Sequence, residues 1–179
     1  SMLDPLTKIY NRKSFDEGVL RAIAEADNDH APLSLLRVDI DHCKHFNDSY
    51  GHQTGDQGLR LVALTLKSNI KGKDIVARYG GEEFAILARE TDAIGARVIA
   101  ERLRTAIERQ YAATRDGEVA VTISVGLVTV SSEVDDSATI VSAADQALYE
   151  AKRAGRNCVR VAPASATSQA PTATVVALG

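Results

Sequence analysis

The sequence predicts an α/β fold in which helices cover a mixed β-sheet in layers. Four long segments carry apolar residues at helical spacing, and short runs of β-branched and apolar residues lie between them. Along the chain, the predicted order is helix, strand, helix, hairpin, helix, strand, helix, strand. The 179 residues are 45% hydrophobic and 25% charged. This is ordinary globular composition, and the length predicts one domain with a sizeable core.

The amino-terminal half supplies two helices and a central strand. Residues 11–29 have apolar side chains at helical spacing, with Asn11 as the expected N-cap, and residues 54–70 predict a second long helix. Residues 32–40 form a continuous apolar run that ends in acids. Such a run predicts a buried strand whose carboxyl end opens to solvent.

A β-hairpin is predicted for residues 74–88. Its two arms are rich in β-branched, aromatic and apolar residues, and Gly80-Gly81 lies where a two-residue turn needs positive φ. Glu82 and Glu83 would then lie at the tip, where a metal and a phosphate could approach. Taken alone the signal is weak, because a Gly-Gly hairpin flanked by solvated glutamates is a common surface feature.

The carboxyl-terminal half returns to helices and strands. The segments expected there are a helix at 92–110, a long strand or pair of strands at 118–130, a helix at 137–153 and a closing strand at 157–161. Residues 162–179 are uncharged and rich in Ala, Ser, Thr and Pro. We therefore expect a flexible tail after a domain of residues 4–161.

Composition limits the partners of the chain. The formal charge of -3 and the pI near 5.8 argue against a broad nucleic-acid or anionic-membrane surface, so any bound polyanion should be small. No apolar run approaches the length of a membrane span, and the amino terminus has no signal-peptide core. Two cysteines without metal-type spacing predict cytoplasmic free thiols. The start at Ser1-Met2 suggests a fragment that lacks an upstream sensory domain, and the full-length protein could be membrane-anchored.

The first segment with chemical character follows the predicted central strand. Asp39 and Asp41 alternate and so point to the same face, and a short turn leads into the next helix. Carboxylates beside free backbone amides suit a Mg²⁺-bound nucleotide, although either acid could instead cap the helix. An EF-hand does not fit the spacing. A transition-metal site from His42, Cys43 and His45 is a minor alternative, since no partner pair completes it.

The second segment is the glycine-punctuated loop at residues 46–56. A carboxylate at Asp56 accepts from two adjacent N–H donors, and an amide at Asn47 both donates and accepts. This pattern selects guanine, because adenine lacks the donors that the carboxylate requires. Helix capping is the alternative for both residues.

Two cations form the third group. Lys152 and Arg156 are four residues apart, hence on one face if the helix continues through Gly155. The alternative is that these two cations only interact with the partial negative charge at the carboxyl end of the helix.

Together these motifs resemble one family. The matching motifs, in chain order, are Asp4-Pro5-Leu6-Thr7, Asn11-Arg12, Asp39-Ile40-Asp41, Asn47-Asp48, Gly51-His52, Gly55-Asp56, Arg78-Tyr79-Gly80-Gly81-Glu82-Glu83-Phe84, Ser124-Val125-Gly126, Ala144-Asp145, Ala147-Leu148-Tyr149, Ala151-Lys152 and Gly155-Arg156-Asn157. Over about residues 4–161 the chain resembles the GGDEF domain, the catalytic domain of diguanylate cyclases.

The resemblance implies a fold related to nucleotidyl cyclases and polymerase palms, with a central mixed sheet of about five strands surrounded by helices. It also implies a homodimer in which each domain holds one GTP, and a reaction that joins two GTP into cyclic di-GMP with release of two pyrophosphates. Two alternatives stay open. One is a non-catalytic module that binds GTP or cyclic di-GMP or dimerises, and the other is a single-nucleotide cyclase.

The resemblance also assigns roles to residues. Asp39 and Glu82 would bind Mg²⁺, or Mn²⁺ in its place, with help from the Ile40 carbonyl, and Glu83 would be a second acid at the metal or at the attacking hydroxyl. The residues that match the substrate site are Asn47 and Asp56 for guanine, the amides of His42, Cys43 and Lys44 with the cations Lys44, Lys152 and Arg156 for phosphates, Gly80 and Gly81 for close approach of ribose and α-phosphate, and His52.

The chain departs from the family pattern in three places. Lys8-Ile9 stands where Gly-Leu is usual, and His42-Cys43 stands where aromatic residues are usual. The inhibitory Arg-x-x-Asp motif reads Lys71-Gly72-Lys73-Asp74, so its arginine is missing. Lysine lacks the planar fork of arginine. We therefore expect a degenerate inhibitory site at Lys71 and Asp74, and product binding mainly in the active site.

Overall fold

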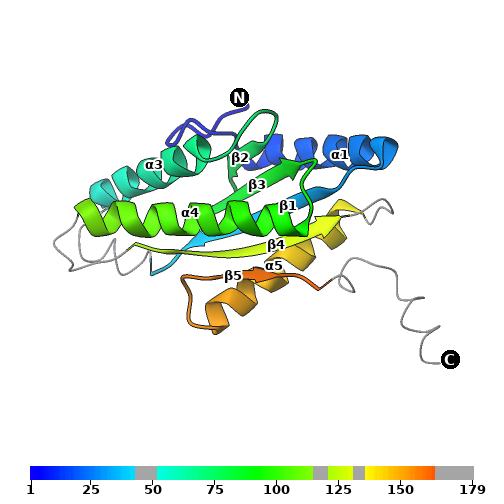
Figure 1. Cartoon of the computed structure of the whole chain (residues 1–179). Coiled ribbons are helices and arrows are strands. Elements are labelled where there is room, and N and C mark those ends of the chain that lie inside the picture. Colours follow the sequence, from blue (N-terminus) through cyan, green and yellow to red (C-terminus); the bar gives the residue numbers. More distant parts are fainter. Residues whose placement is uncertain (43–51, 115–120, 131–135, 164–179) are drawn as a thin grey trace.

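The computed structural model describes residues 1–42, 52–114, 121–130 and 136–163. Its centre is one five-stranded sheet in the order β2-β3-β1-β4-β5. The elements are α1 (Arg12–Asp29), β1 (Leu33–Ile40), α3 (His52–Ser68), β2 (Ile75–Arg78), β3 (Glu83–Arg89), α4 (Ala93–Thr114), β4 (Ile123–Val130), α5 (Ser137–Arg153) and β5 (Val159–Val161). The predicted α/β class is confirmed (Figure 1).

The sheet is mixed, as predicted. β1 pairs antiparallel with β3 and β4, β2 pairs antiparallel with β3, and β5 joins β4 in parallel. A parallel pair needs a crossover between its strands, and α5 is that crossover. The order of the strands places β1 in the middle of the sheet, which explains why its eight residues are all buried.

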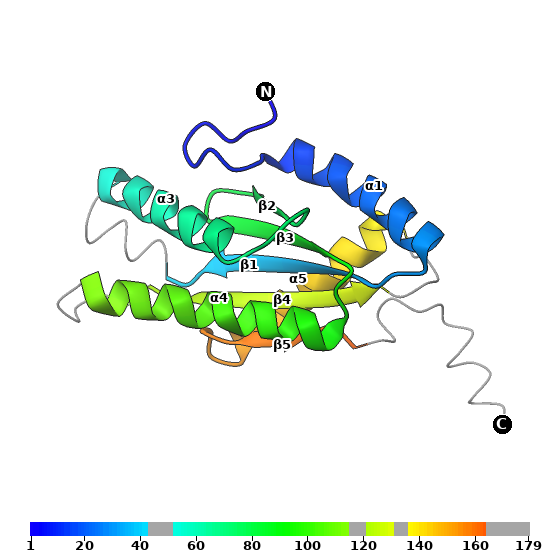
Figure 2. The ribbon, with the colours of Figure 1, turned by 45° about the horizontal axis from the view of Figure 1, so that its top comes forward.

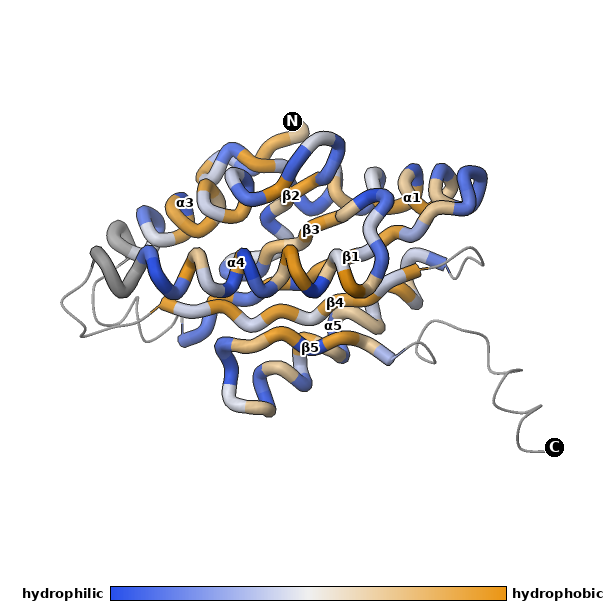
Figure 3. The backbone as a smooth tube through the Cα atoms, in the orientation of Figure 1, coloured by the Kyte–Doolittle hydropathy of each residue, from blue (hydrophilic) through white to orange (hydrophobic). Residues whose placement is uncertain are grey.

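Helices cover both faces of the sheet (Figures 1 and 2). One buried cluster joins Phe15 of α1 and Ile140 of α5 to Leu35 of β1. The other cluster joins α3 and α4 to the opposite face, where Leu36 of β1 lies. Figure 3 shows hydrophobic residues along the strands and mixed residues along α4, as expected for buried strands and half-buried helices.

The alternation of side chains along β1 decides which of them lie on each face of the sheet. Leu35 faces α1 and α5, whereas Leu36 and Val38 face α3 and α4. By the two-residue period, Arg37 and Asp39 therefore lie on the face covered by α1 and α5.

The predicted helices are confirmed: α5 has the predicted bounds, and the ends of the other helices differ by a few residues. Asn11 caps α1 as expected, because its side chain accepts a hydrogen bond from the Ser14 amide at 2.9 Å. α3 begins and ends two residues before the predicted bounds, and α4 runs four residues further. Ends of this kind depend on capping contacts and fray easily.

The predicted hairpin exists, but its turn is longer than expected. Arg78 pairs with Phe84, and the amides of Tyr79 and Gly80 both donate to the Glu83 carbonyl at 2.7 and 3.1 Å. Neither Gly80 nor Gly81 has φ in the left-handed range. The prediction of a two-residue Gly-Gly turn with positive φ was therefore wrong, because a longer loop spreads the reversal over more residues.

The amino-terminal segment packs beside β2. Ile9 is buried, Tyr10 forms a parallel bridge to Ala77, and the Arg78 amide donates to the Tyr10 carbonyl at 2.9 Å. Lys8 has φ of 64°. The family usually has glycine at this position. In this chain a lysine adopts the left-handed conformation that favours glycine.

The remaining predictions concern the last long strand, the tail, the cysteines and membrane spans. The strand predicted at 118–130 is realised as β4, and residues 115–120 lie outside the described residues, as do residues 164–179 of the expected tail. Cys158 is a free thiol, as expected, whereas Cys43 lies outside the described residues. Within the described part, none of the helices is long and apolar enough to cross a membrane.

Candidate functional site

The acids singled out in the sequence meet where β1 ends and β3 begins. Asp39 and Glu83 are register partners in the antiparallel pair. Directly opposite residues project to the same face with Cβ atoms about 5 Å apart. The amide of Ile40 donates to the Glu82 carbonyl at 3.1 Å, which fixes the turn against the end of β1. The expected convergence of the strand-end acid and the hairpin acids is thus present.

Asp39 is a buried carboxylate with one oxygen unsatisfied. Its Oδ2 accepts from the ammonium of Lys152, in the last turn of α5, whereas Oδ1 is buried without a hydrogen-bond partner in the described part of the protein. Burial raises the pKa of Asp39, the charges of Glu82 and Glu83 raise it further, and the Lys152 ammonium opposes them. A buried carboxylate oxygen without a partner is free to accept a hydrogen bond or to contact a cation.

Asp41 has a different environment from Asp39, although both are buried. It accepts hydrogen bonds from the hydroxyls of Ser124 and Thr122 at 2.6 and 2.7 Å and from the Asn157 amide at 3.0 Å. Three donors from β4, the residue before it and the loop before β5 satisfy its oxygens. Asp41 therefore acts as a structural anchor, and this role was not predicted from the sequence.

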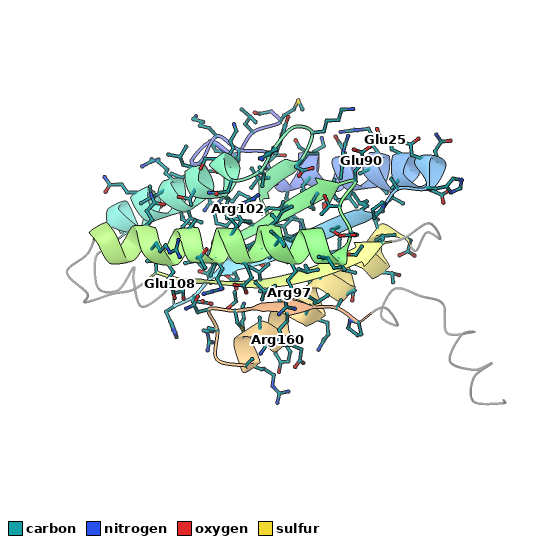
Figure 4. All side chains as sticks on the ribbon, viewed as in Figure 1. Glu25, Glu90, Arg97, Arg102, Glu108 and Arg160 are labelled. Atoms are coloured by element: carbon teal, nitrogen blue, oxygen red, sulfur yellow. The ribbon has the colours of Figure 1, made fainter. Side chains whose placement is uncertain are left out.

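A second contact holds the loop that Asp41 anchors. The side chain of Asn157 accepts from Arg104 of α4 at 2.9 Å and donates to Glu108, one turn further along that helix. In Figure 4, Glu108 projects from α4 toward the β5 side of the molecule. The Gly-Arg-Asn motif thus serves to fasten the end of α5 to the sheet and to α4.

The carboxylate of Glu83 lies against the turn. Its Oε1 accepts from Nη2 of Arg37 at 2.7 Å. A Cβ built on Gly80 would be 2.4 Å from Oε2 of Glu83, whereas a Cβ on Gly81 would meet none of the described atoms within 4 Å. Gly80 therefore leaves room for the Glu83 carboxylate in this position, and Gly81 leaves the turn open on its described side. Glu82 is exposed.

Arg37 is the main residue that the sequence analysis missed. Its guanidinium bonds to Glu83 and Asp145 and lies 4.2 Å from the centre of the Tyr79 ring. A lone arginine in the apolar run 32–40 was a usable signal, because arginine is rarely buried unless it is paired.

Lys152 and Arg156 do not share a helical face. α5 ends at Arg153, and Gly155 and Arg156 have φ of 113° and 67°. A glycine in this conformation terminates helices. The helix ends where it was predicted to end, so the condition for a shared face is not met. Lys152 reaches Asp39, while Arg156 is exposed on the turn.

The expected nucleotide-binding residues are only partly described. Cys43, Lys44 and Asn47 lie outside the described residues, and so does the side chain of His52, which begins α3. Asp56 is exposed on α3, and the guanine pair therefore stays a prediction. His42 is exposed, with φ of 56°. In the described part of the chain, no three His, Cys, Asp or Glu side chains converge as a preformed metal centre.

The degenerate inhibitory motif forms an exposed turn. Lys71 and Lys73 are exposed, and Gly72 has φ of 58°. Asp74 is held in place, because its Oδ1 accepts from the Arg89 amide at 2.9 Å. Burial raises the pKa of Asp74, opposed by this hydrogen bond and by the Arg89 charge.

Known proteins resemble this chain in sequence. Residues 1–158 match the family described as "Diguanylate cyclase, GGDEF domain". The chain is 38% identical over 164 residues to diguanylate cyclase DosC of Escherichia coli K12, covering 91% of the chain and 35% of DosC. It is 40% identical over 158 residues to YhcK of Bacillus subtilis 168, covering 87% of the chain and 44% of YhcK. The chain thus spans less than half the length of these relatives.

Solved structures agree with the sequence matches. The GGDEF domain of DgcB from Caulobacter crescentus, in complex with c-di-GMP, superposes with a TM-score of 0.84 at 37% identity over 90% of this chain and 96% of that chain. The active GGEEF domain of a diguanylate cyclase from Vibrio cholerae gives a TM-score of 0.80 at 32% identity, over 86% and 97%. Its motif is spelled as in Gly80 to Phe84. The chain belongs to the GGDEF family of diguanylate cyclases.

Proposed function

We propose that this chain is a catalytically active diguanylate cyclase domain that condenses two GTP into cyclic di-GMP with Mg²⁺. The observation that carries the proposal is the buried Asp39 at the strand end opposite Glu83, whose Oδ1 has no hydrogen-bond partner among the residues that the structure describes. Membership of the family and the 32% identity to the active GGEEF domain from Vibrio cholerae support it.

The residues present fit a divalent cation. Asp39, Glu82, Glu83 and the Ile40 carbonyl would hold it, since Mg²⁺ takes one or two carboxylates together with phosphate oxygens. When bound, the cation supplies charge stabilisation at the phosphate. Mn²⁺ has similar oxygen preference and can replace Mg²⁺.

The other residues of the chain would bind and orient GTP. Asn47 and Asp56 would hydrogen-bond the guanine edge, and the amides of residues 42–44 would contact the terminal phosphates. Lys152 already pairs with Asp39, so its ammonium lies near the phosphate end of the site and would also neutralise phosphate charge. Open space at Gly81 permits backbone approach to the nucleotide.

One domain holds half of the reaction. The 3′-oxygen of each GTP must attack the α-phosphorus of the other, so that two phosphodiester bonds form and two pyrophosphates leave. We propose a two-fold dimer of domains that brings the two nucleotides together, with the rate set by positioning. Since the relatives are more than twice as long as their matched part, we also propose that a separate region of a longer protein controls this pairing.

The test is incubation of the chain with GTP and Mg²⁺, with nucleotides resolved by chromatography. Cyclic di-GMP is expected, and the rate per domain should rise with protein concentration. Glu83→Gln should lower turnover by two orders of magnitude or more, whereas Glu17→Gln on the exposed face of α1 should not. GTP binding without turnover would support a non-catalytic binding module, and cyclic GMP would support a single-nucleotide cyclase; either result overturns the proposal.

A further inference from the structure

Arg37 is a buried cation in the middle of the sheet, beneath the acids of the site. Its side chain is 5% exposed. Nη2 donates to Oε1 of Glu83 at 2.7 Å, Nη1 donates to Asp145 of α5, and the guanidinium lies 4.2 Å from the centre of the Tyr79 ring. One guanidinium thus joins a strand, a helix and the turn that carries the family motif.

The burial of Arg37 is not explained by stability alone. Desolvating a guanidinium is costly, and apolar residues of similar volume often replace buried ion pairs without loss of stability. Nε of Arg37 is also buried without a hydrogen-bond partner in the described structure. On its own face Arg37 is flanked by Leu35, and its partners on the adjacent strands are Ala85 and Gly126, so a leucine or methionine would suit this position. An arginine here does something that packing does not require.

The effect of Arg37 is to fix the direction of the Glu83 carboxylate. The Glu83 side chain is 41% exposed, so without a partner it could rotate into solvent. With Oε1 held by Arg37, Oε2 is the oxygen left for another ligand, and it lies where Gly80 has no side chain. Asp39 follows Arg37 by two residues on the same face and is the register partner of Glu83. The two acids therefore stand side by side on a common support.

Asp145 and Tyr79 keep Arg37 in place. The Asp145 carboxylate holds Nη1 and leaves Nη2 for Glu83, so the two ends of one planar fork bond two separate carboxylates at once. The Tyr79 ring lies over the guanidinium on one face, and Arg12 lies over the same ring at 4.2 Å.

The geometry points to Arg37 as a positioning residue, which holds Glu83 so that its second oxygen can meet the divalent cation. This inference rests on the proposed function and adds a supporting residue to it. Groups that orient metal-binding carboxylates typically change metal affinity or activity by 10- to 100-fold when they are removed. We expect a change of that size on loss of Arg37.

The experiment compares Arg37→Met, Arg37→Lys and a control, Arg21→Met. Arg21 is an exposed arginine of α1 and takes part in none of the contacts described for Arg37. The first measurement is Mn²⁺ affinity by electron paramagnetic resonance, with the protein saturated with a non-hydrolysable GTP analogue. The second is kcat and KM for GTP, and thermal unfolding reports whether each variant is folded.

A folded Arg37→Met protein should bind Mn²⁺ at least tenfold more weakly than the wild type. Its kcat should fall by about 10- to 100-fold, and its KM for GTP should be nearly unchanged. The Mn²⁺ affinity and kcat of Arg37→Lys should lie between those of Arg37→Met and the wild type, because one ammonium cannot reproduce the planar fork of the guanidinium. Arg21→Met should match the wild type in Mn²⁺ affinity, kcat and KM. Wild-type Mn²⁺ affinity and kcat in Arg37→Met overturn the inference. If Arg37→Met does not fold, Arg37→Lys decides, and wild-type values there overturn it equally.

The outcomes separate this inference from the proposed function. If cyclic di-GMP synthesis and Mn²⁺ affinity are unaffected in both Arg37 variants, the positioning role is overturned and the proposed cyclase activity stands. If the chain makes no product but the Arg37 variants bind Mn²⁺ more weakly, the proposed cyclase activity is overturned and the positioning role stands.

Discussion

Asp4 and Arg78 join the amino-terminal segment to the turn of the hairpin. Nη1 of Arg78 lies 3.3 Å from Oδ1 of Asp4, and Nη2 donates to the Gly81 carbonyl at 2.8 Å. Oδ2 of Asp4 accepts from both the amide and the hydroxyl of Thr7. The chain that enters the domain is thus connected through one arginine to the residue before Glu82.

We expect Asp4→Asn to lower the free energy of unfolding at pH 7 by about 1 to 2 kcal/mol, because it removes a charged hydrogen-bond acceptor. Burial alone would raise the pKa of Asp4, but the Thr7 hydrogen bonds and Arg78 outweigh it and lower the pKa below 3.8. Its stabilisation is therefore complete above that value and is lost as the pH falls through the native pKa. Urea unfolding at several pH values measures this loss.

The difference between the wild type and Asp4→Asn should accordingly shrink below pH 4. Glu17→Gln, an exposed acid on α1, should show no such pH-dependent difference. A gap between wild type and Asp4→Asn that stays constant from pH 7 to pH 3 would contradict the assignment.

Asp39→Asn should abolish cyclase activity and yet leave the protein as stable as the wild type or more stable, by about 1 kcal/mol at pH 7. Burial, with Glu82 and Glu83, raises the pKa of Asp39, so the folded state holds its proton more tightly than the unfolded chain. The contribution of Asp39 to stability then falls as the pH rises through the native pKa, and asparagine escapes this loss. Thermal unfolding at pH 4 and pH 7 measures the difference.

Asp41→Asn is the matched control, two residues along the same face. Its three donors would face an amide that accepts fewer hydrogen bonds, so we expect a loss of about 1 to 3 kcal/mol. If Asp39→Asn were as destabilising as Asp41→Asn, the distinction between a functional and a structural aspartate would be lost.

Gly126→Ala should destabilise the fold by about 3 kcal/mol or more, because α5 crosses β4 at this residue. A Cβ there would lie 2.1 Å from the Leu148 amide nitrogen and 2.5 Å from the Ala144 carbonyl oxygen. Both neighbours are backbone atoms, so α5 must move away from the sheet. Gly81→Ala, where a Cβ meets nothing within 4 Å, is the control for stability. A melting temperature of Gly126→Ala within 2 °C of the wild type would refute the close packing.

The fold could be predicted from the sequence because each element carries a local signal. The apolar run of β1 and the amphipathic helices give burial directly, and Asn11 marks the start of α1. The turn could not be derived, because Gly-Gly permits several loop lengths and only the pairing of Arg78 with Phe84 selects one. The bounds predicted for the last helix, 137–153, are those of α5, because its amphipathic pattern is a local signal.

Individual site residues could be predicted from sequence motifs, but most of the contacts between them could not. The resemblance to the family places Asp39 at one metal with Glu82 and Glu83, and the register pairs Asp39 with Glu83. The partners of Arg37 and Asp41 lie on other strands and helices, far away in sequence, and local patterns do not encode such contacts. Burial of a polar residue within an apolar run indicates that partners exist, but not which ones.

The last prediction concerns inhibition by product. Lys71 is exposed beside Gly72, which has φ of 58°, and Asp74 is engaged by the Arg89 amide, so neither residue is arranged as a rigid fork for a phosphate or a guanine edge. We expect cyclic di-GMP to inhibit weakly and competitively with GTP, through the active site. A steady-state inhibition series on the wild type and Lys71→Ala checks this, with the same inhibition constant expected for both. Tight, non-competitive inhibition that Lys71→Ala abolishes would show that lysine replaces the missing arginine.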